Sequence, residues 1–396
     1  MTAEGDENYL TTAEVARRLQ VKPETIYAYV SRGLLTSIRA RGRRGSLFST
    51  TEVDRLASRS VDHSGVVERI ESELTLLQHD ELYYRGHPAS SLATSWTVEQ
   101  VANLLWTGEA PPQPSTTADG SAAAGFAVTR EGVKLARAAI AVAPDTARLT
   151  DRLRVAVAVL GAADPLRFDL SVPAVTAAAG QLIETLVTAL PGDYVAAGAT
   201  LGARLWPKLS DEPPRAEVLD AALILLADHG LAVSTVAARV AASARANLYA
   251  VISAGLGALD GQYHGAAPTL AYEFLRRAQQ DPLKALSDQL RSGEPIPGFG
   301  HRIYEHRDPR AEVLLELLGD HPIVGTIAAI SERSPTFPNS DLAIAAIMHA
   351  YNFRPDAGDA LFAIARMIGW TAHALEEYAA PALRFRAMGI YTGQTT

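Results

Sequence analysis

Three short segments in the last third of the chain place ionisable side chains among glycines and turn-forming residues. They are GQYHG at 261–265, PGFGHRIYEHRDPR at 297–310 and PNSD at 338–341. Glycines beside His264 and His301 allow a ligand to approach both the backbone and the imidazole ring, which a larger neighbour would obstruct. The third segment ends in a carboxylate, Asp341.

Together these side chains can form an acid–base set. Two imidazoles and a carboxylate in one site can move protons to and from a bound substrate. Arg310, in the Asp-Pro-Arg turn, can bind a substrate carboxylate through its guanidinium fork. Each residue taken alone is more often an ordinary loop residue with satisfied hydrogen bonds. Their combination favours the functional interpretation.

Motifs for several other reactions are absent from the sequence. It has no G-x-x-x-x-G-K-[ST] phosphate loop, no G-x-S-x-G nucleophile elbow, no H-E-x-x-H and no strand-led G-x-G-x-x-G. We therefore expect neither nucleotide hydrolysis, serine acyl transfer nor zinc proteolysis, and we predict no metal site.

The segments that must position these residues have the pattern of helices. Apolar residues recur at i, i+3, i+4 and i+7, whereas alternating β patterns are scarce. The helical stretches are 133–142, 152–162, 216–250, 341–350 and 357–378. The fold class is therefore predicted to be all-α, with the Pro-, Ser- and Thr-rich residues 111–124 as an exposed loop.

The first 60 residues have a different pattern, with two short helices followed by a basic hairpin. Thr12 can cap the first helix, and Pro23 fits the first turn of the second. A hairpin over 37–49 carries four arginines suited to phosphate: Arg39, Arg41, Arg43 and Arg44. Residues 1–60 hold 10 Lys and Arg against 7 Asp and Glu, and the remainder holds 26 against 37. We expect different partners for the two parts.

Length and composition limit the class of protein. A chain of 396 residues, 48% hydrophobic and 20% charged, is expected to form two or three folded domains. The chain has no cysteine, so it forms no disulfide and no thiolate metal site, and a reducing compartment is favoured. An acidic N-terminus and the lack of an uncharged apolar run of spanning length predict a cytoplasmic protein without membrane contact.

From about Leu82 to Gly393 the chain resembles the citrate synthase family, in the short bacterial form that includes 2-methylcitrate synthases. The resemblance rests on LYYRGHPASSLA with TVEQVANLLWTGE, ADHGLAVST, GLGALDGQYHGAA, PGFGHRIYEHRDPRAE, FPNSDLAIAAIM, LFAIARMIGWTAHALEE and RAMGIYTG. It implies a homodimer with a large helical domain (61–261 and 351–396) and a small one (262–350), whose cleft closes on substrate.

The resemblance also implies roles in the condensation of an acyl-CoA with oxaloacetate. His264 would donate a hydrogen bond to the thioester carbonyl, and Asp341 would remove the methyl proton. His301 would hydrogen-bond to the ketone of oxaloacetate and protonate it. The residues implied to bind oxaloacetate are His229, Arg310, Arg366 and Arg386, the last reaching the partner subunit's site. No cofactor is implied besides the acyl-CoA substrate.

Residues 10–35, LTTAEVARRLQVKPETIYAYVSRGLL, resemble the helix-turn-helix of the MerR and excisionase-like winged-helix families. The stretch up to Phe48 resembles their wing. This resemblance implies DNA binding through residues 1–60, with base reading by one helix and backbone contacts by the wing arginines. The residues expected on the reading helix are Lys22, Thr25 and Tyr27. A small helical domain for protein contacts is the alternative.

The sequence departs from the family pattern near the CoA side and beside His229. Asp260–Ala267 reads DGQYHGAA where the family has S-G-P-x-H-G-G-A, and Gly230 replaces a glutamate. Glu305 replaces a lysine, so Arg307 would have to attract the CoA phosphate. The second arginine of the terminal RPR is Met388.

Three functions therefore stay open. The first is a citrate synthase that uses acetyl-CoA, favoured because all three catalytic side chains are present. The second is a 2-methylcitrate synthase that uses propionyl-CoA, since one methylene changes discrimination by only about 1–3 kcal/mol. The third is a catalytically inactive transcription regulator that senses a dicarboxylate.

Overall fold

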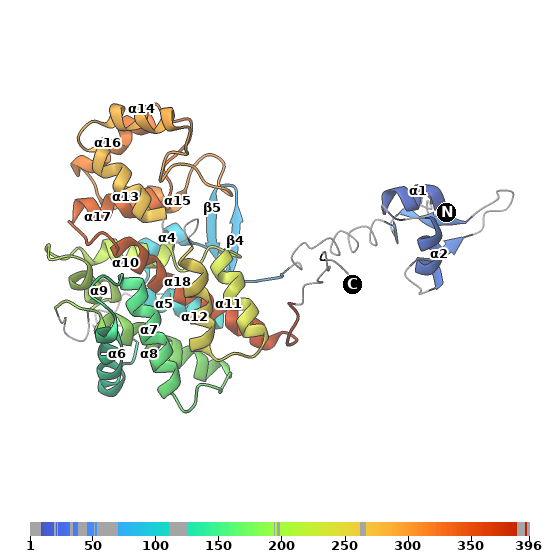
Figure 1. Ribbon diagram of the computed structural model, residues 1–396, viewed down its shortest axis with the longest axis horizontal. Coiled ribbons are helices and arrows are strands. Elements are labelled where there is room, and N and C mark those ends of the chain that lie inside the picture. The colour runs from blue at the N-terminus through green and yellow to red at the C-terminus, as the bar shows by residue number, and fades with distance from the viewer. Residues whose placement is uncertain are drawn as a thin grey trace. The chain divides into compact units, whose positions relative to one another are not determined.

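The structure is a computed structural model. It describes residues 9–19, 21, 23–31, 35–38, 46–50, 52–53, 70–110, 126–193, 195, 199–261, 267–385 and 393. The chain divides into two units (Figure 1). One comprises Met1–Glu71 with Phe385–Thr396, and the other, here called the body, comprises Ser72–Arg384.

The N-terminal unit contains a helix pair and a three-stranded antiparallel sheet. The helices are α1 (Thr12–Arg18) and α2 (Pro23–Ser31), and the strands are β1 (Tyr9–Thr11), β2 (Ser37–Ile38) and β3 (Leu47–Ser49), in the order β1-β3-β2. Its core is made by Val15, Ala16, Leu19, Ile26, Leu35, Phe48 and Val53. The predicted helix-turn-helix and the paired strands of its hairpin are confirmed.

The predicted cap of α1 was wrong by one residue. The N-cap is Thr11, whose side chain accepts a hydrogen bond from the backbone of Glu14, and the Glu14 carboxylate accepts one from Thr11 N at 2.8 Å. This reciprocal capping box needs an acid three residues after the cap. Thr11 has one and Thr12 does not, so the spacing favours Thr11.

The body is mainly helical, as predicted. Its helices are α4 (Ala89–Ser95), α5 (Val98–Thr107), α6 (Arg130–Val142), α7 (Leu149–Ala163), α8 (Val172–Ala189), α9 (Leu201–Leu209), α10 (Ala216–Leu225), α11 (Val233–Ser243), α12 (Leu248–Leu259), α13 (Ala267–Ala278), α14 (Pro282–Ser292), α15 (Pro309–Leu317), α16 (Pro322–Ser331), α17 (Ser340–Ala350) and α18 (Ala357–Ala379). Helix α18 is apolar on nearly every side and is buried along most of its length, as such a pattern requires. Helices α13–α17 pack on one another at one end of the body (Figure 1).

A small antiparallel sheet opens the body, and the sequence analysis did not predict it. Its strands are β4 (Thr75–Gln78), β5 (Glu81–Tyr84) and β6 (His87–Pro88). His79 and Asp80 have positive φ angles of 53° and 55°, which match the tight turn of a two-residue hairpin. The strands are too short for a clear alternating pattern.

The stretch 216–250, predicted as continuous helix, is divided into α10, α11 and α12. Gly230 has a φ of +62° in the turn between α10 and α11, and Arg245 has a φ of 62° between α11 and α12. Apolar residues continue through both breaks, so periodicity alone did not reveal them. The first break matters because it carries His229.

One helix in the described part of the chain, α8, is long and apolar enough to cross a membrane by length and composition alone. Of this stretch, 56% is buried inside the body. A core helix has the same composition.

Candidate active site

Helix α17 begins at a cap that also fixes a loop. The side chain of Asn339 accepts hydrogen bonds from Asp341 N at 3.0 Å and Leu342 N at 3.2 Å, which satisfies two free amides of the first turn. Its amide donates to Gly300 O at 2.9 Å. One side chain therefore holds both Asp341 and the residue before His301.

The loop that precedes His301 needs its glycines. Gly298 and Gly300 both have a φ of +79°, a conformation that favours glycine. Gly300 N donates to Phe337 O at 2.7 Å, so the loop lies against the segment before α17. A Cβ on Gly298 would come within 2.7 Å of the Leu342 side chain. This close approach brings the loop onto the helix of Asp341.

The hydrogen bonds of His301 define its tautomer. Nδ1 accepts from Ile303 N at 3.1 Å and Tyr304 N at 3.3 Å. Burial lowers the pKa of His301 below its ordinary value of 6.5, and Arg310 lowers it further. The ring is therefore neutral at pH 7, with its proton on Nε2, where it can be donated to a ligand.

His229 lies next to His301, in the turn between α10 and α11. The two rings meet edge to face with centroids 5.1 Å apart. His229 Nε2 lies 3.1 Å from the hydroxyl of Tyr304. Burial lowers the pKa of His229 well below 6.5, and the charges of Arg310 and Arg366 lower it further. The site thus contains two neutral imidazoles.

Arg310 and Arg366 supply buried positive charge. Arg310, in α15, donates to Asp308 from Nε at 3.0 Å and from Nη2 at 2.8 Å. Arg366, in α18, lies over the Phe362 ring at 4.6 Å and donates from Nε to Leu226 O at 3.0 Å. Among the described residues, the Nη1 of Arg366 has no hydrogen-bond partner. A buried guanidinium with an unused donor can bind an anion.

Asp341 lies close enough to the charged side chains around it for them to change its pKa. Burial raises the pKa of Asp341 to about 6, and Asp308 adds to the rise, whereas Arg310 and Arg366 act in the opposite direction. The side chain keeps some access to solvent. A carboxylate with such a pKa is mostly ionised at pH 7 and is a stronger base than an ordinary aspartate.

The structure thus brings five of the predicted site residues into one region: His229, His301, Arg310, Asp341 and Arg366. Two other predicted residues, His264 and Arg386, lie outside the described residues. Arg307 forms ion pairs with Glu81 and Glu312, so its charge is already compensated.

In the N-terminal unit, two of the predicted DNA-binding residues are described, and both lie on α2. Tyr27 is 62% exposed, and Thr25 is partly exposed. The others lie outside the described residues: Lys22, Arg39, Arg41, Arg43 and Arg44.

Sequence reasoning missed three residues that shape the site. Tyr304 bonds His229 and lies beside the His301 ring, with centroids 4.7 Å apart. Asp308 is the counter-ion of Arg310, and Asn339 caps α17. All three lie within the quoted motifs. The spacing of Asp308, two residues before Arg310, was the one local signal of a pairing.

No group of three or more His, Asp or Glu residues in the described part of the chain is placed to hold a metal ion.

Comparison with known proteins gives two family matches. The family described as the C-terminal domain of citrate synthase matches residues 65–386, and a helix-turn-helix domain matches residues 9–60. The 2-methylcitrate synthase of Mycobacterium tuberculosis is 30% identical over 348 residues, covering 80% of this chain and 86% of its own length. The citrate synthase of Haloferax volcanii is 30% identical over 362 residues, covering 82% and 93%.

Solved structures agree with the sequence matches. The crystal structure of citrate synthase from Thermotoga maritima aligns with a TM-score of 0.68 at 25% identity, covering 84% of this chain and 96% of that one.

Proposed function

The chain belongs to the citrate synthase family and carries a helix-turn-helix domain, and from this premise we propose that it condenses an acyl-CoA with oxaloacetate to release CoA. The observation that carries the choice of oxaloacetate is the pair of buried guanidinium groups. Arg310 and Arg366 are 3% and 1% exposed, and Nη1 of Arg366 has no partner among the described residues. A carboxylate of the substrate would supply the missing acceptor.

His301 is proposed to bind and protonate the ketone. Its Nε2–H would donate to the ketone oxygen and so polarise the carbonyl carbon. A neutral donor aimed at a developing oxyanion stabilises charge that forms only in the transition state. As the new carbon–carbon bond forms, the same proton would pass to the oxygen, and solvent would return a proton to the imidazole.

Asp341 is proposed as the base. Its carboxylate would take a proton from the carbon next to the thioester carbonyl, and the resulting enol or enolate would attack the ketone carbon of oxaloacetate. Water would then cleave the thioester to give the carboxylic acid and CoA. The role of His264 as donor to the thioester carbonyl rests on the family resemblance. The proposal requires no metal and no cofactor besides the two substrates.

The acyl donor is proposed to be acetyl-CoA, with propionyl-CoA as the alternative. The relatives that are 30% identical include both citrate and 2-methylcitrate synthases. CoA release measured with both donors, in the presence of oxaloacetate, tests the reaction and ranks the donors by kcat/KM.

The N-terminal unit is proposed to bind DNA. Tyr27 is exposed on α2, the second helix of the pair, where a reading helix presents its side chains. Binding of the full-length protein to a DNA duplex should weaken steeply with salt, as phosphate contacts require. Tyr27→Ala should weaken the binding and leave CoA release unchanged.

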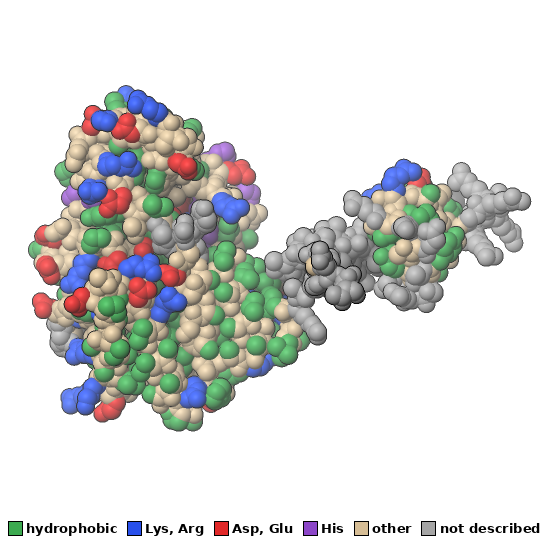
Figure 2. Space-filling model, in the orientation of Figure 1, with side chains coloured by type: hydrophobic (Ala, Val, Ile, Leu, Met, Phe, Trp, Pro, Cys, Tyr) green, Lys and Arg blue, Asp and Glu red, His purple; other side chains and the backbone are tan. Residues whose placement is uncertain are grey.

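The chain is proposed to form a homodimer, in which Arg386 reaches the partner subunit's site. Hydrophobic side chains gather on the surface near α11 (Figure 2), where Val233 is 68% exposed and Val240 is 44% exposed. An apolar surface of this kind is expected to be covered. Light scattering of the purified protein tests this proposal.

We also propose a cytoplasmic location.

A further inference from the structure

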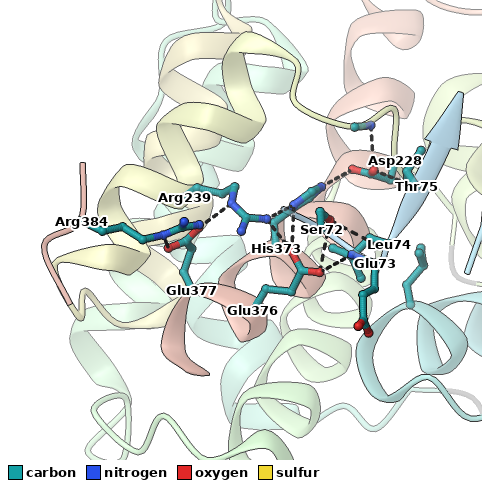
Figure 3. Close-up of polar contacts among 12 residues, drawn as sticks. Ser72, Glu73, Leu74, Thr75, Asp228, Arg239, His373, Glu376, Glu377 and Arg384 are labelled. Carbon is teal, nitrogen blue, oxygen red and sulfur yellow. Dashed lines mark hydrogen bonds and ion pairs between the residues drawn. The ribbon is translucent and has the colours of Figure 1, made fainter. Parts of the chain in front are cut away.

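A chain of buried polar groups leads from the turn of His229 into the body (Figure 3). It starts at Asp228, whose side chain is fully buried. Its carboxylate accepts hydrogen bonds from Thr75 Oγ1 at 2.5 Å, Gly230 N at 2.9 Å and His373 Nε2 at 3.2 Å. Burial acts to raise the pKa of Asp228, but the hydrogen bonds from His373 and Thr75 and the charge of Arg366 outweigh it and hold the pKa below its ordinary value of 3.8. Asp228 is therefore a buried anion.

The direction of the hydrogen bonds in this chain is fixed by Arg239. Arg239 Nη1 lies 2.6 Å from His373 Nδ1. A guanidinium can only donate, so Nδ1 is an acceptor and the proton of the neutral ring is on Nε2. That proton points to Asp228. Arg239 is itself held by ion pairs to Glu376 at 2.7 Å and Glu377 at 2.6 Å.

The same turn is also held through its backbone. The Tyr84 hydroxyl donates to Asp228 O at 3.0 Å, and Gly369 N donates to Ala227 O at 3.0 Å. A Cβ on Gly369 would come within 2.4 Å of Ala227 O, so α18 lies directly against the turn. The two residues before His229 are thus held in place by contacts with α18 and β5.

We propose that Asp228 and His373 are positioning residues for oxaloacetate. His373 holds the Asp228 carboxylate, which fixes the turn of His229 and balances the charge of Arg366. Neither residue need touch the substrate. Through them, His229 and Arg366 keep the orientation in which they meet a dicarboxylate. This inference rests on the proposed function.

Replacement of His373 separates this role from simple packing. His373→Leu replaces the imidazole with an apolar group of similar bulk and so removes the donor to Asp228. Because hydrogen bonds to charged groups are strong, we expect oxaloacetate to bind about 10–100-fold more weakly. His373→Gln keeps a donor and an acceptor at the two ends of its amide. It should recover most of the lost affinity.

A matched control comes from another buried ion pair. Glu184 is 4% exposed and pairs with Arg204 at 2.7 Å, on α8 and α9. Glu184→Gln should lower the unfolding temperature and leave oxaloacetate binding unchanged. It therefore reports what general destabilisation does to the site.

The experiment is a calorimetric titration of oxaloacetate into four full-length proteins, with KM for both substrates and thermal unfolding measured in parallel. The proteins are the wild type and the variants H373L, H373Q and E184Q. The inference is supported if H373L weakens oxaloacetate binding, H373Q restores it, and the KM for acyl-CoA changes less than threefold.

Unchanged oxaloacetate binding in H373L overturns the inference. So does an equal loss of binding in H373L and E184Q, or a failure of H373Q to restore it, since either result would assign His373 a packing role. A wild type that binds no oxaloacetate refutes the proposed function itself, and the inference with it, so the two failures are distinguishable.

Discussion

Arg310 is tied by two side-chain hydrogen bonds to Asp308, at 3.0 and 2.8 Å, and the same carboxylate accepts a bond from Ser340 N at 2.9 Å. Ser340 is the first residue of α17, the helix that carries Asp341. One buried carboxylate therefore joins the cation proposed to bind substrate to the helix of the proposed base.

Asp308→Asn is expected to destabilise the protein by about 3–5 kcal/mol, because it leaves the buried Arg310 without a counter-ion. The KM for oxaloacetate should also rise. Urea unfolding and steady-state kinetics measure the two effects. The control is Glu312→Gln, which removes an ion pair to Arg307 at the surface and should cost less than about 1 kcal/mol. Equal losses in the two variants would contradict this account of Asp308.

The pH dependence of kcat/KM should show an acidic limb at about pH 6. Asp341 must be ionised to act as a base, and its pKa is raised to about 6 by burial. Activity should therefore increase as the pH rises through 6. A limb near pH 4, typical of an exposed carboxylate, would argue against Asp341 as the titrating group.

The raised pKa of Asp341 also makes the folded protein less stable at neutral pH than at low pH. A carboxyl whose pKa is higher in the folded than in the unfolded state favours folding below its unfolded value, near 3.8, and loses this contribution as pH rises through about 6. Asp341→Asn removes this loss. The variant should therefore gain stability relative to wild type between pH 4 and pH 7 in a series of thermal melts, while it loses turnover.

Gly298→Ala should destabilise the loop of His301. Gly298 has a φ of +79°, and an added Cβ would meet the Leu342 side chain at 2.7 Å. Both the backbone strain and the clash move the loop away from α17, so CoA release should fall together with the unfolding temperature. Gly325→Ala is the control, because its Cβ would meet nothing within 4 Å. That variant should be neutral or slightly stabilising, as alanine is in a helix.

Arg366→Lys should weaken oxaloacetate binding at least tenfold, although it retains the charge. Lysine lacks the planar fork that pairs with a carboxylate at two points, and Nη1 of Arg366 is the unused donor. Arg152→Lys serves as a control, since Arg152 donates only to the backbone carbonyls of Ile140 and Pro144 among the bonds it makes in the described structure. Calorimetry should show unchanged oxaloacetate binding in the control.

Local signals in the sequence predicted much of the fold. The stretch 341–350 differs from α17 by one residue, because its apolar residues recur at helical spacing. The break around His229 was missed because it depends on Asp228, whose partners Thr75 and His373 are far away in the sequence.

In the candidate site, too, local signals in the sequence indicated some residues, whereas others depend on contacts between residues far apart in the sequence. The local pattern of glycines and turn residues indicated His301, Asp341 and Arg310. Resemblance added His229 and Arg366, and the structure brings all five into one region. Resemblance did not supply Tyr304, because the contact of Tyr304 with His229 joins residues 75 positions apart. The protonation states could not be predicted from the sequence, because burial is the largest cause of each shift in pKa at His229, His301 and Asp341.

The most direct test of the central claim is the release of CoA thiol by the purified protein with oxaloacetate and either acetyl-CoA or propionyl-CoA. His301→Ala and Asp341→Ala are measured beside it, with thermal unfolding to show that both variants fold. We predict turnover by the wild type and its loss in both variants. No turnover with either donor, from a folded protein that still binds oxaloacetate, would contradict the claim and favour a regulator that senses a dicarboxylate.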